Sequence, residues 1–235
     1  MSMIMPDILY ETIKHLTYPE LVNICGSTKV YSILCTTNNL FINLILNKET
    51  DYLLSRYQPT EALLFAINNN NDLIVKELLK QGVDPSFNDN IIMNACIKGS
   101  IKVINNLLED PRIDPSIKNN QPLIEAIKNN HVSIVDRLLA DPRVDPTDRN
   151  NNALILACQY GFTGIVDRLL QDPRVDPSDN DNLAIVRATS YGHLSVINRL
   201  LDDIRVNVKA RNNAAIKEAT RRGYKDIVNR LTIIV

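Results

Sequence analysis

Cysteine and histidine are the residues of this chain with the broadest chemistry, because thiolates and imidazoles bind metals and act as nucleophiles or bases. The cysteines lie at Cys25, Cys35, Cys96 and Cys158 and form no Cys-x-x-Cys pair. Cys96 and Cys158 each directly follow an alanine that recurs along the chain. This placement favours small buried thiols in a reducing compartment over zinc ligands.

The histidines are also placed as structural residues. His131 and His193 occupy the same position of a sequence repeat, and Phe162 and Tyr224 fill that position in other copies. A position shared by imidazole, phenyl and phenol rings indicates packing rather than catalysis. His15 has no neighbouring cysteine or paired carboxylate. With no nucleophile–base pair, Gly-rich phosphate loop or metal spacing, we predict no catalytic residue, metal site, cofactor or small-molecule substrate.

An internal repeat positions these residues. One alanine recurs at a fixed distance before a branched-apolar pair and a leucine, at Ala66, Ala95, Ala126, Ala157, Ala188 and Ala219. From Ala95 onward the spacing is 31 residues, and only the first interval is shorter, at 29. A chain built from copies of one unit is typical of an array whose function is to bind.

Each copy is predicted to be a short helical hairpin. Between Asn152 and Leu170 the apolar residues follow helical spacing, and Gly161 interrupts them, as a glycine in the left-handed conformation does at a helix end. The connectors contain two Asp-Pro pairs, which exclude helix and sheet interior. These connectors span 110–116, 141–147 and 172–178. Asparagines such as Asn119 and Asn120 follow them, where short polar side chains can cap the next helix.

These residues resemble the ankyrin repeat family, and the run Asn-Ala-Leu-Ile-Leu-Ala-Cys-Gln-Tyr-Gly from Asn152 to Gly161 is a close match. The resemblance implies an all-α fold, an ankyrin-type solenoid of helical hairpins. We place its six repeats at 59–88, 89–118, 119–149, 150–180, 181–211 and 212–235. The finger after each Asp-Pro is shorter than usual, which resembles the arrays of giant DNA viruses and some protists. That resemblance implies a viral protein engaged in host–virus interaction.

The first 58 residues lie outside the array and read as a helical module at 1–46 with a connecting helix at 47–58. From Leu16 to Cys35 the module resembles the F-box, although Met5 and Pro6 stand one residue closer to the helix than the family's Leu-Pro opening. The resemblance implies docking on the Skp-type linker of a cullin-RING ubiquitin ligase. Its docking residues would be Ile8, Leu9, Ile13, Leu16, Leu21 and Ile24. The alternative is a helical cap on the solenoid with no partner.

One face of the first helix of each repeat varies while the surrounding residues stay constant, as expected of a recognition surface on a fixed scaffold. The expected contacts with a protein target are Phe65, Lys98, Lys128, Leu156, Gln159, Tyr160, Arg187, Tyr191, Arg221 and Arg222. Tyrosine and arginine dominate interface energies, so Leu156, Tyr160, Arg187 and Tyr191 form the richest cluster. The alternative is that Tyr160 and Tyr191 only stack on each other.

Composition sets the remaining expectations. A net charge of -1 argues against a general nucleic-acid binder, although eight basic residues between Arg205 and Arg230 face only Glu218 and Asp226. That basic end could contact RNA, an acidic partner or a membrane surface, but a solvated cap is the preferred interpretation. No run of about 18 apolar residues and no signal pattern is present. We therefore expect an intracellular, non-enzymatic monomer of the host cytoplasm or nucleus.

Overall fold

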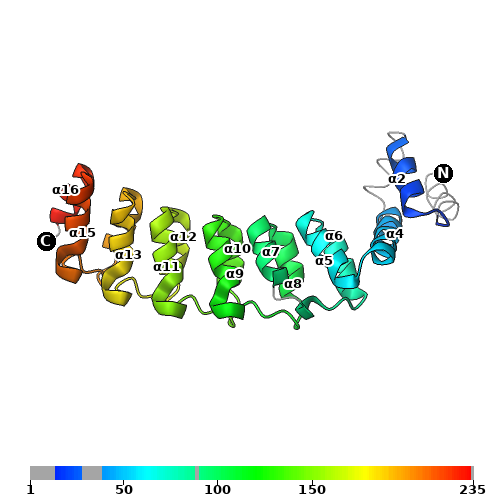
Figure 1. The fold of residues 1–235 in the computed structure, drawn as a ribbon, viewed down its shortest axis with the longest axis horizontal. Helices are drawn as coiled ribbons and strands as arrows, with labels where there is room; N and C mark the ends of the chain where they lie inside the picture. Colours follow the sequence, from blue (N-terminus) through cyan, green and yellow to red (C-terminus); the bar gives the residue numbers. More distant parts are fainter. Residues whose placement is uncertain (1–13, 28–38, 88–89, 234–235) are drawn as a thin grey trace. The chain divides into compact units, whose positions relative to one another are not determined.

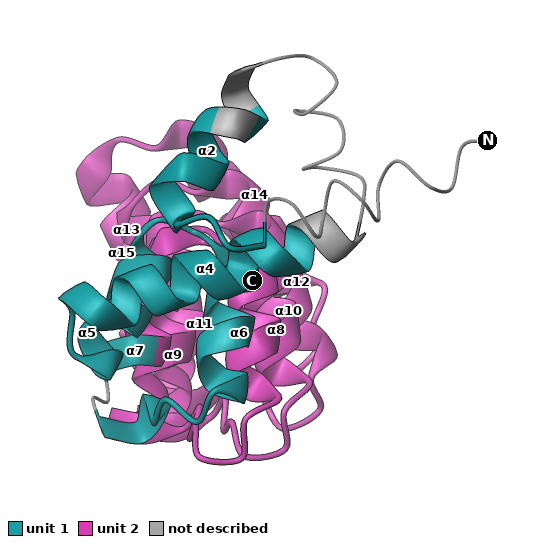
Figure 2. Cartoon of the chain, turned by 90° about the vertical axis from the view of Figure 1, so that its right-hand side faces the viewer, with its two compact units in different colours: residues 1–91 teal, residues 92–235 magenta. Residues whose placement is uncertain are grey.

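The structure is a computed structural model, and it describes residues 14–27, 39–87 and 90–233 of the 235-residue chain. Throughout these ranges the regular elements are helices, and no strand is present. The prediction of an all-α solenoid of helical hairpins is confirmed. The chain divides into two compact units, Met1–Ile91 and Ile92–Val235, which are coloured separately in Figure 2.

Unit 1 contains the N-terminal helices together with the first repeat. Its elements are α2 (Tyr18–Ser27), α4 (Asn39–Arg56), α5 (Pro59–Asn68), α6 (Asp72–Lys80) and the 3-10 turn η1 (Pro85–Phe87). Helix α4 packs against α2, α5 and α6, so it links the N-terminal helices to the first repeat. The predicted boundary between residues 46 and 47 falls inside α4.

A small apolar cluster holds the N-terminal helices together. Leu21 of α2 is 0% exposed and Leu44 of α4 is 8% exposed, with Leu16, Cys25 and Ile45 packed around them. Few of the described apolar side chains form this core, and so small a core is marginal alone. Its stability therefore depends on the packing of α4 against the first repeat.

The remaining repeats form unit 2, in which each repeat contributes two helices (Figure 1). The helices are α7 (Asn90–Lys98), α8 (Ile101–Leu108), α9 (Ile117–Lys128), α10 (Val132–Leu139), α11 (Asp148–Tyr160), α12 (Thr163–Gln171), α13 (Asp179–Ser190), α14 (Leu194–Leu201), α15 (Ala210–Arg222) and α16 (Lys225–Thr232). First helices pack on first helices, as α11 does on α13 and α13 on α15.

Small and branched side chains explain this stacking. Ala157 and Ala188, the recurring alanines, are both 0% exposed, and a methyl side chain lets neighbouring backbones approach closely. The second helices bury their branched stripe, as at Ile165 and Val166 of α12. Each repeat therefore completes its core with the next one, as expected of a solenoid.

Helix α15 carries exposed polar residues at two positions that are apolar and buried in α9. Ile124 and Ile127 of α9 are buried, whereas the corresponding residues of α15 are Lys217 and Thr220, which are exposed. These exposed polar side chains leave that part of α15 compatible with water.

Candidate functional site: a variable face on a bonded scaffold

The connectors bind neighbouring repeats through arginine. Arg174 donates from Nε and Nη2 to the carboxylate of Asp172, at 2.9 and 2.6 Å, and from Nη1 to the carbonyl of Val144 in the preceding repeat, at 2.9 Å. Arg143 and Arg205 make the same pair of contacts in their own repeats. The guanidinium holds the pKa of the Asp172 carboxyl below its usual range. These arginines are fully engaged in holding the scaffold.

Three consecutive left-handed residues interrupt the start of the first helix in each of the last four repeats, within α9, α11, α13 and α15. In one copy, Lys118, Asn119 and Asn120 have φ values of 52°, 61° and 58°. The buried Asn120 side chain accepts a hydrogen bond from the backbone N–H of Asp145, in the connector that leads to the next repeat, at 2.9 Å, and donates to Asp148 at 3.2 Å. These asparagines thus bridge repeats, and the predicted capping of the following helix is not what the structure shows.

The break between the two helices of a repeat holds an aromatic ring. Nε2 of His193 donates to the carbonyl of Gln159 at 2.9 Å, and His131 makes the same contact with Ile97 at 3.1 Å. The His193 ring also covers Gly161, where an added Cβ would lie 2.5 Å from Nδ1. The structural interpretation of these histidines agrees with this geometry. Together with the connector and asparagine bonds, these contacts are called the inter-repeat seam below.

The predicted target-contacting residues lie along the first helices. In unit 1, Phe65 of α5 is 44% exposed. In unit 2 we call the following set the variable face: Lys98 on α7, Lys128 on α9, Leu156, Gln159 and Tyr160 on α11, Arg187 and Tyr191 at the end of α13, and Arg221 and Arg222 on α15. Leu156 and Gln159 are half-buried and the others are exposed.

The two tyrosines of the variable face are held in place without being buried. Tyr160 is 41% exposed and stacks on Phe162 with ring centroids 5.5 Å apart. Tyr191 is 50% exposed and stacks on His193 at 6.4 Å. The alternative in which Tyr160 and Tyr191 stack on each other is not what the structure shows. Rings fixed from beneath offer a partner contact area at a low cost in side-chain entropy.

Acidic neighbours neutralise several cations of the variable face. Glu218 accepts from Arg221 at 2.6 Å and from Arg222 at 2.9 Å, and these hydrogen bonds lower the pKa of Glu218 to about 2. Lys128 pairs with Glu125 at 3.0 Å. The basic end of the chain therefore presents less unpaired charge than its sequence indicates.

The predicted linker-docking residues are only partly within the described ranges. Ile8, Leu9 and Ile13 lie outside them, as does the side chain of Ile24. Leu21 is fully buried, so it supports the core of the module and is not available to a partner. The exposed apolar residue of α2 is instead Val22, at 48%.

Two of the predicted structural thiols are confirmed as buried. Cys96 and Cys158 are free, 0% exposed, and burial raises the pKa of both thiols, which keeps them unreactive. Cys25 differs from the expectation of a reduced thiol, because it is disulfide-bonded.

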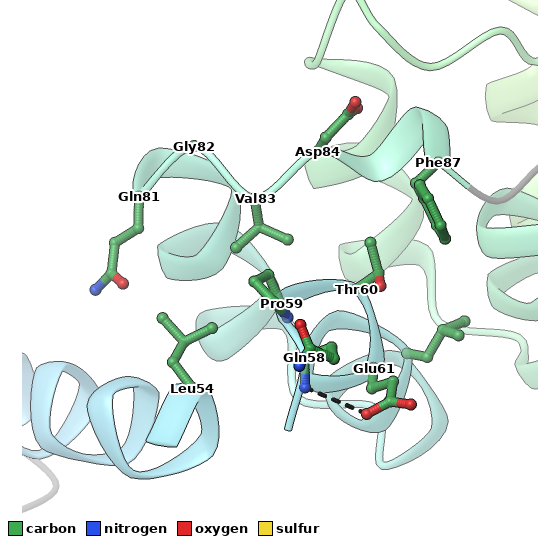
Figure 3. A pocket seen from close by; sticks show the side chains of 11 residues that line it. Leu54, Gln58, Pro59, Thr60, Glu61, Gln81, Gly82, Val83, Asp84 and Phe87 are labelled. Carbon is green, nitrogen blue, oxygen red and sulfur yellow. Dashed lines mark hydrogen bonds between the residues drawn. The ribbon is translucent and has the colours of Figure 1, made fainter. Parts of the chain in front are cut away.

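A pocket of about 770 Å³ lies in unit 1, and sequence reasoning did not find it (Figure 3). Its lining comes from α4, from the start of α5 and from the first connector: Leu54, Gln58, Pro59, Thr60, Glu61, Leu64, Gln81, Gly82, Val83, Asp84 and Phe87. Phe87 is 78% exposed at its edge. No clear signal for it is present in the sequence, because the position of Phe87 holds Ile117 and Ala210 in two other repeats and Asp148 and Asp179 in two more.

Comparison with protein families gives four overlapping matches to a model of three ankyrin repeats. The matched residues are 63–150, 92–181, 123–212 and 154–233. The chain belongs to the ankyrin repeat family. A search of curated proteins finds no match. The helix pairs and buried alanines described above are what the ankyrin match requires, and ankyrin repeats indicate a role in protein–protein interaction.

Two other classes of site are absent from the described ranges of this ankyrin repeat protein. None of its described helices combines the length and the apolar character needed to span a bilayer. Across residues 14–27, 39–87 and 90–233, no group of histidine, cysteine and acidic side chains is arranged to hold a metal ion.

Proposed function

We propose that this ankyrin repeat protein is a non-enzymatic adaptor whose variable face holds a protein target and whose N-terminal helices dock on the Skp-type linker of a cullin-RING ubiquitin ligase. One observation carries the proposal. The inter-repeat seam is built from the same residue types in successive copies, whereas the variable face differs from copy to copy and stays exposed. A fixed frame with a changing surface is suited to recognition.

The target-binding half of the proposal is tested by removing the exposed rings. The double variant Tyr160→Ala and Tyr191→Ala should lose captured target protein in affinity purification from cells. An exposed hot-spot residue typically contributes about 2 kcal/mol or more to binding. Arg168→Ala is the matched control, because Arg168 is comparably exposed on α12, outside the variable face, and pairs with Asp136. Equal capture by wild type and double variant would sink this half.

The ligase half rests on the resemblance of residues 16–35 to the F-box and on the exposed apolar Val22 of α2. The test is a pull-down of purified Skp-type linker and cullin by the full chain and by the double variant Leu9→Glu and Val22→Asp. Leu21 is left intact, because a charge in that buried position would unfold the module. Asn47→Asp adds a charge at an exposed position of α4 as a control. Saturable binding lost only in the double variant supports docking.

A second candidate function is an interaction scaffold in which the N-terminal helices only cap the repeats. The packing of α4 against α5 and α6 favours it. Deleting residues 1–38 keeps α4 whole and distinguishes the capping role from the docking role. A cap predicts a lower melting temperature and no linker binding by the intact chain. A docking module predicts linker binding by the intact chain that the deletion abolishes.

A further inference from the structure

Arg187 is set apart from the other arginines of the chain by having no partner. Connector arginines hold aspartates and carbonyls, Arg137 and Arg230 bind asparagines, and Arg56 lies over the ring of Tyr52. Ion pairs are made by Arg112, Arg143, Arg168, Arg174, Arg199, Arg205, Arg221 and Arg222. Arg211 makes hydrogen bonds, and Arg149 lies 2.5 Å from the side-chain amide of Asn119. The side chain of Arg187, in contrast, makes no hydrogen bond, ion pair or ring contact within the described residues.

The residues that occupy the position of Arg187 in the neighbouring repeats do not neutralise its charge. The residue corresponding to Arg187 in the next repeat is Glu218, and Glu218 is already bonded to both Arg221 and Arg222. In the preceding repeat the corresponding residue is the uncharged Leu156. An exposed guanidinium therefore stands between a neutralised neighbour and an apolar one, with its planar set of donors available.

The residues that share the variable face with Arg187 on α11 and at the end of α13 are apolar or aromatic. Tyr191 lies one helical turn further along the chain, and α13 packs against α11, which carries Leu156 and Tyr160. A carboxylate that binds a guanidinium in a partly desolvated, ring-lined setting forms a stronger hydrogen bond than one in open water. The combination suits an acidic side chain that has an apolar or aromatic neighbour in the same segment.

We propose that the surface formed by Leu156, Tyr160, Arg187 and Tyr191 binds an acidic, aromatic- or aliphatic-containing segment of a protein, with one carboxylate on Arg187. This inference rests on the proposed target-binding function and specifies its chemistry. A nucleic acid fits less well, because binding a phosphate backbone uses several cations. On the variable face Lys128, Arg221 and Arg222 are already ion-paired, and Lys98 lies on the distant helix α7.

Short random peptides displayed on phage are the probe, selected against the full chain and then measured as free labelled peptides by fluorescence polarisation. The selected peptides should contain aspartate or glutamate beside an apolar residue. Arg187→Ala should weaken their binding by about tenfold or more, since a charged hydrogen bond is lost. The control Arg168→Ala should leave binding unchanged. Replacing the peptide's acidic residue by lysine should abolish binding, and Arg187→Glu should restore it.

The outcomes separate this inference from the function on which it rests. Peptides that lack acidic residues and ignore Arg187→Ala, yet are lost in Tyr160→Ala, would overturn the acidic anchor and keep target binding on this face. Peptides that ignore both variants would overturn the two together. Binding of a single-stranded RNA probe would also overturn the proposal if the slope of log affinity against log salt concentration indicates more than about one released counterion. For the acidic peptides, a slope that corresponds to about one ion pair supports the proposal.

Discussion

The inter-repeat seam and the variable face use the same kinds of side chain in opposite ways. On the seam, Arg174 holds Asp172 and a carbonyl of the neighbouring repeat. On the variable face, Arg187 makes no such contact, although its side chain has the same charge and donors. Residue type alone therefore does not assign a role in this protein. The role follows from whether a partner lies within the chain or has to come from outside.

The largest loss of stability is expected from a substitution at Gly161, in the turn between α11 and α12. Gly161→Ala places a Cβ 2.5 Å from the His193 ring at a φ of +76°, so it should destabilise the protein by about 4 kcal/mol, from steric overlap and left-handed strain together. Gly223→Ala has a φ of +75° with no atom within 4 Å, and should cost only about 1 kcal/mol. Urea unfolding measures both variants. Equal losses would show that the ring contact is not part of the seam.

A slightly smaller effect is expected at the asparagine bridge. Asn120→Ala should cost about 3 kcal/mol, because it leaves the backbone N–H of Asp145 without its acceptor and puts alanine in a left-handed position. Asn213 has the same conformation but its buried Oδ1 has no partner, so Asn213→Ala should cost about 1 kcal/mol. Thermal and urea unfolding compare the pair. A cost at Asn213 that matches the cost at Asn120 would contradict the bridging role.

Acid should weaken the seam through its aspartates. Arg112, Arg143, Arg174 and Arg205 hold the pKa values of Asp110, Asp141, Asp172 and Asp203 below their ordinary values. A carboxyl whose folded pKa is depressed adds stability above its unfolded pKa, and this stability is lost as the pH falls from about 4 through the folded value. Asp172→Asn should therefore lower stability at neutral pH by about 1 kcal/mol and make the acid loss shallower. Urea unfolding measured at several pH values gives the slope of stability against pH for wild type and Asp172→Asn. Equal slopes for the two proteins would show that the ion pair contributes nothing.

Much of the seam could be read from the sequence, because local pattern and tertiary role coincide there. The spacing of Ala126, Ala157 and Ala188 predicted the buried column, and Gly161 predicted the left-handed helix end. The shared column of His131 and His193 predicted a structural ring. The role of each of these residues follows from its position within its own repeat, so the repeat pattern is enough to predict it.

Other features depend on contacts distant in sequence and could not be predicted. Lysine rarely adopts a left-handed conformation, yet Lys118 does so two residues before Asn120, whose side chain bonds to Asp145. Leu21 was expected to be a docking residue because its segment resembles the F-box, yet its neighbours place it in the core. For Arg187 a signal existed, since it lacks the aspartate that stands two residues before Arg174.

The comparison is tested most directly by measuring Arg174→Ala and Arg187→Ala side by side, in urea unfolding and in binding to the selected acidic peptides. Arg174→Ala should lower the unfolding free energy by about 1 to 2 kcal/mol through lost charge-assisted hydrogen bonds, and leave peptide affinity within about twofold. Arg187→Ala should change stability by less than about 0.5 kcal/mol, as surface substitutions usually do, and weaken peptide binding by about tenfold or more. The reverse pattern, or two variants that behave alike, would contradict the division between a scaffold seam and a recognition face.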